Sequence, residues 1–180
     1  MECLHFQNNV ERVQRHGRGY GEGEIVRHAM EHSTLIQSAG CFAKCTSKLW
    51  VDNFSACMQP WNGQLLMKGV FDHAFSPRKA TTLAYIDTRF YAMDLQTYQQ
   101  HFLHAHESIR AQDGYGLEES FRDIFLNQQL QGCLMSPPPV ICGVGGGTGA
   151  YYKNTPLRQL KEKWRYQLVK RNPLFRSWFA

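Results

Sequence analysis

The longest strand-like run of the chain, residues 81–93, carries three polar residues in its middle. It reads TTLAYIDTRFYAM, so Asp87, Thr88 and Arg89 interrupt a segment rich in β-branched, aromatic and apolar side chains. Side chains two residues apart point to the same face of a strand, so we expect Asp87 and Arg89 to share a face. A carboxylate and a guanidinium that project together can grip a polar substrate or form a simple surface ion pair. The sequence leaves both interpretations open at this point.

Strand and helix patterns are mixed along the chain, which favours an α/β protein. Further strands are expected at CFAKCT, LWVDNF, LLMKGVF and PVIC. Helices are expected over about 22–39, 94–111 and 117–131, and a glycine-rich loop over 14–23. We therefore predict an α/β fold with a mixed sheet flanked by helices, in one domain over residues 1–152.

The composition is typical of a soluble globular protein. Of the 180 residues, 43% are hydrophobic and 19% are charged, which excludes a disordered chain. No apolar run approaches the roughly 20 residues of a membrane-spanning helix. The start, MECLHFQNNVERV, lacks the basic and apolar regions of a secretory signal. The six cysteines form no CxxC pair, so we expect reduced thiols and a cytoplasmic protein.

The net positive charge lies at the C-terminus. Residues 151–180 hold eight Lys and Arg and one acid, a net charge of +7, whereas the other 150 residues hold twelve bases and fourteen acids. Thr155-Pro156 is a typical helix start. The apolar residues that follow at helical spacing are Leu157, Leu160, Trp164 and Leu168.

We therefore predict a basic amphipathic C-terminal helix in a tail over residues 153–180. Such a helix can lie on an anionic membrane surface, so we expect residues 156–180 to place the protein at the inner face of the cytoplasmic membrane. A helix that simply packs on the domain is the main alternative. Nucleic-acid binding uses the same charges and is the less favoured one.

Two segments before the long strand carry polar residues that could contact a ligand. GRGYGEGE places Tyr20 and Glu22 among glycines, where acids favour sugar or base hydroxyls over phosphate. Ordinary helix capping is the alternative. FAKCTSK places Lys44 and Lys48 four residues apart, and on a strand both would face one side and could hold a diphosphate. Solvated surface lysines are the alternative.

Three later segments add candidates. Glu118, at a helix start in GLEES, could act as a general base or simply complement the helix dipole. His104 belongs to a histidine cluster without HExxH or CxxC, so we expect a sugar contact or a surface cluster, and no zinc site. The loop GVGGGTGA is neither a dinucleotide-binding fingerprint nor a P-loop. We expect it to close over a ligand through Gly145, Gly146, Gly147 and Thr148.

The chain resembles a group of bacterial glycosyltransferases from capsule and lipopolysaccharide synthesis clusters. The resemblance covers about residues 17–152 and rests on the order and spacing of its motifs. In chain order they are GRGYGEGEIVRHAMEHS, FAKCTSKLWVDNF, YIDTRFYAM, HAHESIRAQDGYGLEESF and GVGGGTGAYY.

The resemblance implies a GT-A-like fold and transfer of a sugar from a nucleotide-sugar donor to a glycan or lipid-linked acceptor. It places Tyr20, Glu22, Lys44 and Lys48 near the donor, Asp87 and Arg89 at the reaction centre, and Glu118 as a candidate base. These enzymes carry an earlier β-α-β portion for the nucleotide base, so we expect the domain to be incomplete at its N-terminal end.

A divalent cation, Mg²⁺ or Mn²⁺, is a possible cofactor of such an enzyme. YIDTR contains no DxD pattern, so we expect Asp87 to contact a substrate hydroxyl or act as a base, and we assign no metal ligand. Two other functions fit the same residues. One is a non-catalytic interaction protein that docks by its basic tail, and the other is a nucleic-acid binder.

Overall fold

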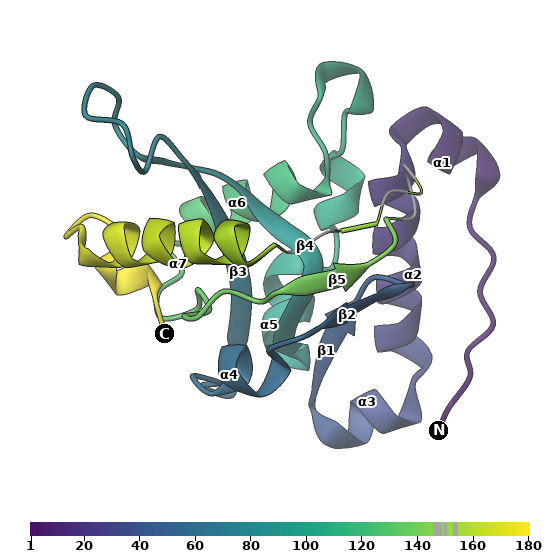
Figure 1. Ribbon diagram of the computed structural model, residues 1–180. Helices are drawn as coiled ribbons and strands as arrows, with labels where there is room; N and C mark the ends of the chain where they lie inside the picture. Colours follow the sequence, from purple (N-terminus) through teal and green to yellow (C-terminus); the bar gives the residue numbers. More distant parts are fainter. Residues whose placement is uncertain (146–148, 150, 153–154) are drawn as a thin grey trace.

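The computed structural model describes residues 1–145, 149, 151–152 and 155–180 and shows a mixed α/β protein (Figure 1). A three-stranded antiparallel sheet has the order β1-β4-β3, formed by β1 Cys41–Cys45, β4 Thr82–Asp94 and β3 Leu65–Asp72. A second antiparallel pair joins β2 Leu49–Val51 to β5 Ile141–Gly143. The expected strands are present, but both sheets are small and antiparallel, so the predicted mixed sheet is not formed. Among the described residues, parallel pairing is limited to isolated bridges at Leu134.

The helices cover the two ends and one face of this sheet. They are α1 Val10–His16, α2 Arg18–His32, α3 Thr34–Ala39, α4 Phe54–Met58, α5 Leu95–Thr97, α6 Leu117–Asn127 and α7 Pro156–Arg171. Short π and 3-10 turns are η1 Tyr98–Phe102, η2 Ala105–Ser108, η3 Ala111–Asp113 and η4 Arg176–Trp178. Helix α6 packs along β4, the first three helices lie at one end of the molecule, and α7 lies at the other (Figure 1).

The predicted glycine-rich loop over 14–23 is wrong, because most of this segment is helical. Helix α2 already begins at Arg18, and its glycines allow close packing rather than a turn. A Cβ on Gly23 would lie 2.2 Å from the Cβ of His106, and one on Gly19 would lie 3.2 Å from the Cβ of Leu117. The glycines are therefore needed where η2 and α6 press against α2.

The single helix expected over 22–39 is broken at Ser33. This residue has an extended backbone with ψ 117°, and its hydroxyl accepts a hydrogen bond from the Ile36 N–H at 3.1 Å. It therefore caps a separate helix, α3. The helix expected over 94–111 is likewise divided into short turns, although Asp94 caps it as predicted by accepting from the Thr97 N–H at 2.8 Å.

The C-terminal segment is part of the main hydrophobic core. The helix start at Thr155 is confirmed, since its hydroxyl accepts from the Arg158 N–H at 3.3 Å. Tyr166 and Phe179 are buried in the same cluster as Phe71 of β3. These two aromatic side chains are therefore packed in the protein core. Within the described residues, no helix has both the length and the apolar character to cross a bilayer.

The Gly23→Ala variant tests the packing explanation. Alanine normally stabilises a helix by about 0.5–1 kcal/mol over glycine. The clash with His106 should outweigh this gain. We therefore expect the variant to have a free energy of unfolding about 1–3 kcal/mol below that of the wild type. Chemical denaturation measures the difference.

Gly21→Ala is the matched control in the same helix. Its Cβ would meet the Nδ2 of Asn8 and the Cγ2 of Val13 at 3.0 Å, which are the ends of side chains that can move aside. Its effect should be smaller than that of Gly23→Ala. A stabilised Gly23→Ala protein would show that the packing explanation is wrong.

Candidate functional site

The segment Asp87-Thr88-Arg89, named here the DTR run, lies at a break in the pairing of β3 with β4. Lys68 is opposite Asp87 and Met67 is opposite Tyr91, so residues 88–90 have no partner on β3. Irregularities of this kind redirect side chains and are frequent next to active sites. The extra residues form a β-bulge in β4, and this bulge leaves room for Asp87 and Arg89 to project together from one face of the strand.

Asp87 is held between two cations. The Nε and Nη2 of Arg89 donate to its two carboxylate oxygens at 2.7 and 2.5 Å, and the Nζ of Lys68 lies 3.5 Å from Oδ2. Burial alone would raise the pKa of Asp87, but the bonds from Arg89 and the charge of Lys68 outweigh it and keep the pKa below its ordinary value. The shared face predicted for Asp87 and Arg89 is confirmed. The buried carboxylate is ionised and fully engaged, so it suits a positioning role better than proton transfer.

A second cluster forms around Lys44 of β1. Its ammonium contacts the Glu22 carboxylate and donates to the Thr46 hydroxyl at 2.8 Å and to the Thr88 carbonyl at 2.7 Å. Burial lowers the pKa of Lys44 to about 8, while the charges of Cys45, Asp87 and Glu118 act in the opposite direction. The Thr88 hydroxyl donates to Glu118 Oε1 at 3.2 Å. Residues from four distant segments therefore meet at the middle of β4.

The two neighbouring glutamates at the start of α6 have different partners. Glu119 Oε2 accepts from the Gly116 N–H at 2.8 Å and so caps its own helix. Glu118 turns toward β4 and accepts from Thr88 instead. The helix-capping interpretation therefore explains Glu119, and Glu118 remains half-exposed and open to another ligand.

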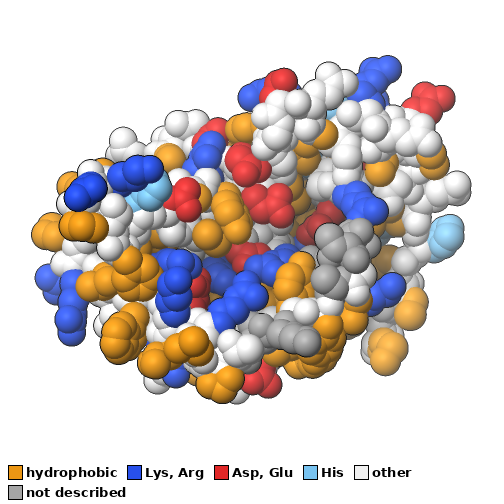
Figure 2. Space-filling view, turned by 45° about the horizontal axis from the view of Figure 1, so that its top comes forward, with side chains coloured by type: hydrophobic (Ala, Val, Ile, Leu, Met, Phe, Trp, Pro, Cys, Tyr) orange, Lys and Arg blue, Asp and Glu red, His pale blue; other side chains and the backbone are white. Residues whose placement is uncertain are grey.

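A cavity of about 370 Å³, named here the basic pocket, opens beside Arg89. It lies between β4, the 137–141 segment and α7. Its cationic lining residues are Lys68, Arg89, Arg158, Lys161, Lys163 and Arg165. Tyr85 and Tyr152 add aromatic walls, and the Arg89 guanidinium lies 4.9 Å from the centre of the Tyr152 ring. Figure 2 shows basic and acidic side chains gathered around the hollow in the middle of this face.

A second cavity of about 640 Å³ lies between α2, α3 and β1 and is named here the α2–β1 groove. Its walls are mostly apolar and include Met30, Ile36 and Phe42, with Glu22 and Lys44 also among its lining residues. The Lys44 cluster and the Arg89 pair therefore border different cavities, and Thr88 lies between them in sequence and contacts the first through its carbonyl.

Two residues that the sequence analysis assigned to substrate binding, Tyr20 and His104, lie away from both clusters. The Tyr20 ring is buried, and its hydroxyl accepts from Arg12 Nη1 at 3.0 Å. His104 is exposed, and its Nδ1 lies 3.0 Å from Glu107 Oε1 on the surface. The structure gives these side chains local partners instead of bringing them to the DTR run.

Lys48 does not share a strand face with Lys44. Strand β1 ends at Cys45, and Lys48 occupies the turn before β2 with a left-handed backbone of φ 65°. The same-face placement predicted for Lys44 and Lys48 is therefore wrong. The exposed Lys48 side chain borders neither cavity.

The glycine loop is only partly described. A Cβ on Gly145 would lie 3.0 Å from the Tyr152 hydroxyl, so this glycine makes room for the ring that stacks on Arg89. The other three loop residues predicted to cover a ligand, Gly146, Gly147 and Thr148, lie outside the described residues.

Sequence reasoning missed the residues that make the pocket basic. Lys68 sits inside the apolar run LLMKGVF, and a lysine in a buried strand was a usable signal. Tyr85 has the same two-residue spacing to Asp87 that Asp87 has to Arg89. Tyr152 and the α7 cations carried no comparable signal, because only the fold brings them to β4.

The side chains at the DTR run do not fit a divalent cation. Both oxygens of Asp87 are bonded by Arg89, with Lys68 beside them. In the described parts of the chain, no group of three or more His, Cys, Asp or Glu could hold a metal ion. Glu162 is the single carboxylate in the described lining of the basic pocket, where it stands among six Lys and Arg side chains, so we assign no step to a metal.

Asp87→Asn tests the role of the buried carboxylate. The folded pKa of Asp87 is lowered, so its ionised form stabilises the protein above the unfolded pKa, near 4, and this is lost as the pH falls through the folded value. We expect the variant to lose about 3 kcal/mol of unfolding free energy at pH 7. The gap to the wild type should shrink below about pH 4. Denaturation at several pH values checks this, and a gap independent of pH would contradict it.

Comparison of the chain with protein-family models, with curated proteins and with solved structures finds no match. What the chain does is therefore argued from its own residues and their geometry.

Proposed function

We propose that this protein transfers a sugar from a nucleotide-diphospho-sugar to a glycan or lipid-linked acceptor. The observation that carries the proposal is the basic pocket at the DTR run, where Thr88 of the same run holds the carboxylate of Glu118. The motif order that resembles capsule and lipopolysaccharide glycosyltransferases supports the same assignment.

The basic pocket suits a diphosphate. Arg89 can offer donors to phosphate oxygens while Asp87 holds its guanidinium in place, and Lys68 adds a second buried charge. Cations of α7 form the opposite wall. Positive side chains then neutralise the leaving diphosphate, a role that a metal ion fills in many enzymes. Tyr85 and Tyr152 provide flat surfaces against which a base or sugar ring can stack.

Glu118 is the residue best suited to act as base. It is half-exposed and accepts a hydrogen bond from Thr88, whereas Asp87 is buried and paired. Burial raises the pKa of Tyr85, and the charges of Asp87, Glu118 and Glu119 add to this effect while Arg89 opposes it. In the proposed step the acceptor oxygen bonds to the anomeric carbon and its proton passes to Glu118. The bond from that carbon to the phosphate oxygen breaks, and the nucleoside diphosphate leaves toward Arg89 and Lys68.

Calorimetric titration with UDP-, GDP-, CMP- and dTDP-sugars tests donor binding, with the CMP-sugar, which carries one phosphate, as the comparison for the diphosphate. We expect one of them to bind the wild type with a dissociation constant of about 1 μM to 1 mM. Arg89→Met should weaken binding about 10-fold or more, because charged hydrogen bonds are worth about 1.5–3 kcal/mol. Lys163→Gln, at an exposed rim position, should weaken it less without disturbing the fold.

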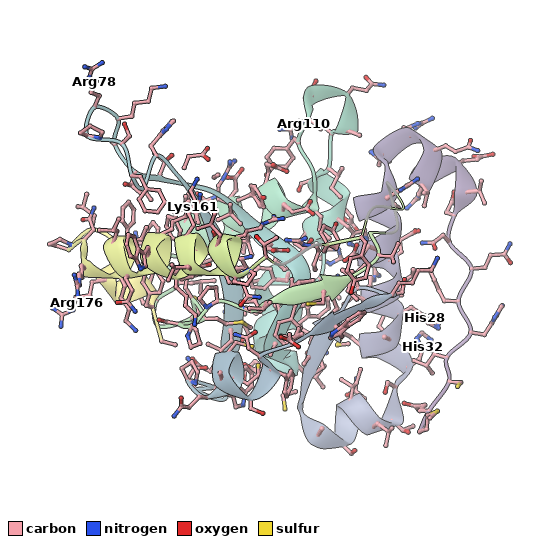
Figure 3. The ribbon with its side chains drawn as sticks, in the orientation of Figure 1. His28, His32, Arg78, Arg110, Lys161 and Arg176 are labelled. Carbon is pink, nitrogen blue, oxygen red and sulfur yellow. The ribbon has the colours of Figure 1, made fainter. Side chains whose placement is uncertain are left out.

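Arg110→Gln is the matched control. Arg110 is an exposed arginine that lies away from α7 in Figure 3, where it and Lys161 are labelled. It should bind the donor like the wild type. A folded wild-type protein that binds none of the four nucleotide classes would exclude an intact transferase. The non-catalytic interaction protein would then be the better description.

Glu118→Gln tests the catalytic base. It keeps a hydrogen-bond acceptor for Thr88 but removes the proton acceptor, so we expect kcat to fall about 10²–10⁴-fold with donor affinity nearly unchanged. Glu119→Gln removes a charge from the adjacent position and should affect stability more than kcat, since Glu119 caps α6. Equal losses of kcat in the two variants would assign the effect to the helix start rather than to a base.

A further inference from the structure

Helix α7 has two apolar faces, and only one of them is buried in the protein. Its inner face contributes Tyr166 and Val169 to the core. The Tyr166 hydroxyl also donates to the Gly69 carbonyl of β3. The helix is therefore fixed to the sheet in one orientation and presents a defined outer face to solvent.

The outer face carries a row of large apolar side chains. These residues, between 46% and 77% exposed, are Leu157, Leu160, Trp164 and Leu168. Their spacing of three or four residues puts them along one side of the helix. Exposed apolar residues scattered singly need no explanation, but a continuous row on one helix marks an interaction surface. We name this row the α7 stripe.

Basic residues border the α7 stripe on both sides. By helical geometry, Lys161 and Arg165 follow one edge and Lys163 follows the other. Glu162 is the only acidic residue of the helix, and it pairs with Arg165 at 2.6 Å. In Figure 3, Lys161 and Arg176 lie at the α7 end of the molecule, far from His28 and His32 on α2.

We propose that the α7 stripe docks on an anionic lipid bilayer. Leucines and a tryptophan with flanking lysines and arginines match a surface with an apolar interior and negatively charged headgroups. This inference rests on the outer face of α7 alone and does not depend on the proposed sugar transfer.

The same features disfavour other occupants. Two copies meeting through this face would bring their basic borders together, which costs energy by like-charge repulsion. A nucleic acid would use the charges but gain little from the exposed leucines. An anionic bilayer can bury the apolar row in its hydrocarbon region and pair its headgroups with the basic residues beside the row.

Co-sedimentation with lipid vesicles tests the proposal. The probes are vesicles of phosphatidylcholine alone and of phosphatidylcholine with phosphatidylglycerol. We expect the wild-type protein to partition at least about tenfold more strongly onto the anionic vesicles, with the preference falling as salt rises. No binding to anionic vesicles, or equal binding to both kinds, would overturn the proposal.

Two double variants with unchanged charge test the contribution of the apolar side chains of the α7 stripe to vesicle binding. Leu160→Gln with Leu168→Gln should reduce partitioning at least about tenfold, because both side chains then lose their burial in the bilayer. The matched control, Val10→Gln with Leu35→Gln, changes two equally exposed apolar residues on α1 and α3 and should bind like the wild type. All four positions are exposed, so both proteins should keep the wild-type circular dichroism and melting behaviour.

Charge variants and two further assays complete the test. Arg171→Glu at the end of α7 should weaken binding, whereas Arg15→Glu on α1 should not. Unchanged vesicle binding by the double leucine variant would overturn the docking surface. Stripe-dependent dimers in sedimentation velocity, or duplex DNA binding that equals vesicle binding, would also overturn it in favour of a second copy or a nucleic acid.

Discussion

The buried carboxylate of Asp87 is the constraint on which the candidate site depends. An ionised carboxylate with an exposed fraction of 2% needs cationic partners, because an unpaired charge in the interior costs several kcal/mol. Arg89 and Lys68 provide them, and the bulge in β4 gives the aspartate and arginine the room to do so. Arg89 is thereby fixed at the mouth of the basic pocket with Tyr152 stacked on it. The charge pair fixes the geometry of the pocket more than it stabilises the fold.

Helix α7 combines three roles. Its inner face completes the core beside Phe71, its sides line the basic pocket, and its outer face carries the α7 stripe. A helix anchored by Tyr166 can present cations in fixed positions, which a free tail cannot do. Residues 158–165 therefore form a wall of the basic pocket. A transferase that works on lipid-linked acceptors would need its pocket near a bilayer, and the placement of α7 is compatible with that need.

The sequence predicted what depends on neighbouring residues and missed what depends on distant ones. Alternation along a strand placed Asp87 and Arg89 on one face, and local capping chemistry located Asp94 and Thr155. The contact of Lys44 with the Thr88 carbonyl depends on strand pairing across more than forty residues of chain, so periodicity alone could not reveal it. The glycines of α2 led to a wrong loop prediction, because glycine is favoured both in flexible loops and where helices pack closely. The spacing of the α7 stripe was visible, but whether it faced the core or solvent was not.

The central claim is that Asp87, Arg89 and Lys68 build a binding place for a diphosphate under α7. Titration of the ¹⁵N-labelled wild-type protein with inorganic pyrophosphate, followed by amide chemical shifts, tests it most directly. The account predicts saturable shifts concentrated at Lys68, Arg89 and residues 158–165, where the basic pocket lies. Shifts centred on the α2–β1 groove, or weak shifts spread over all exposed lysines and arginines, would contradict it.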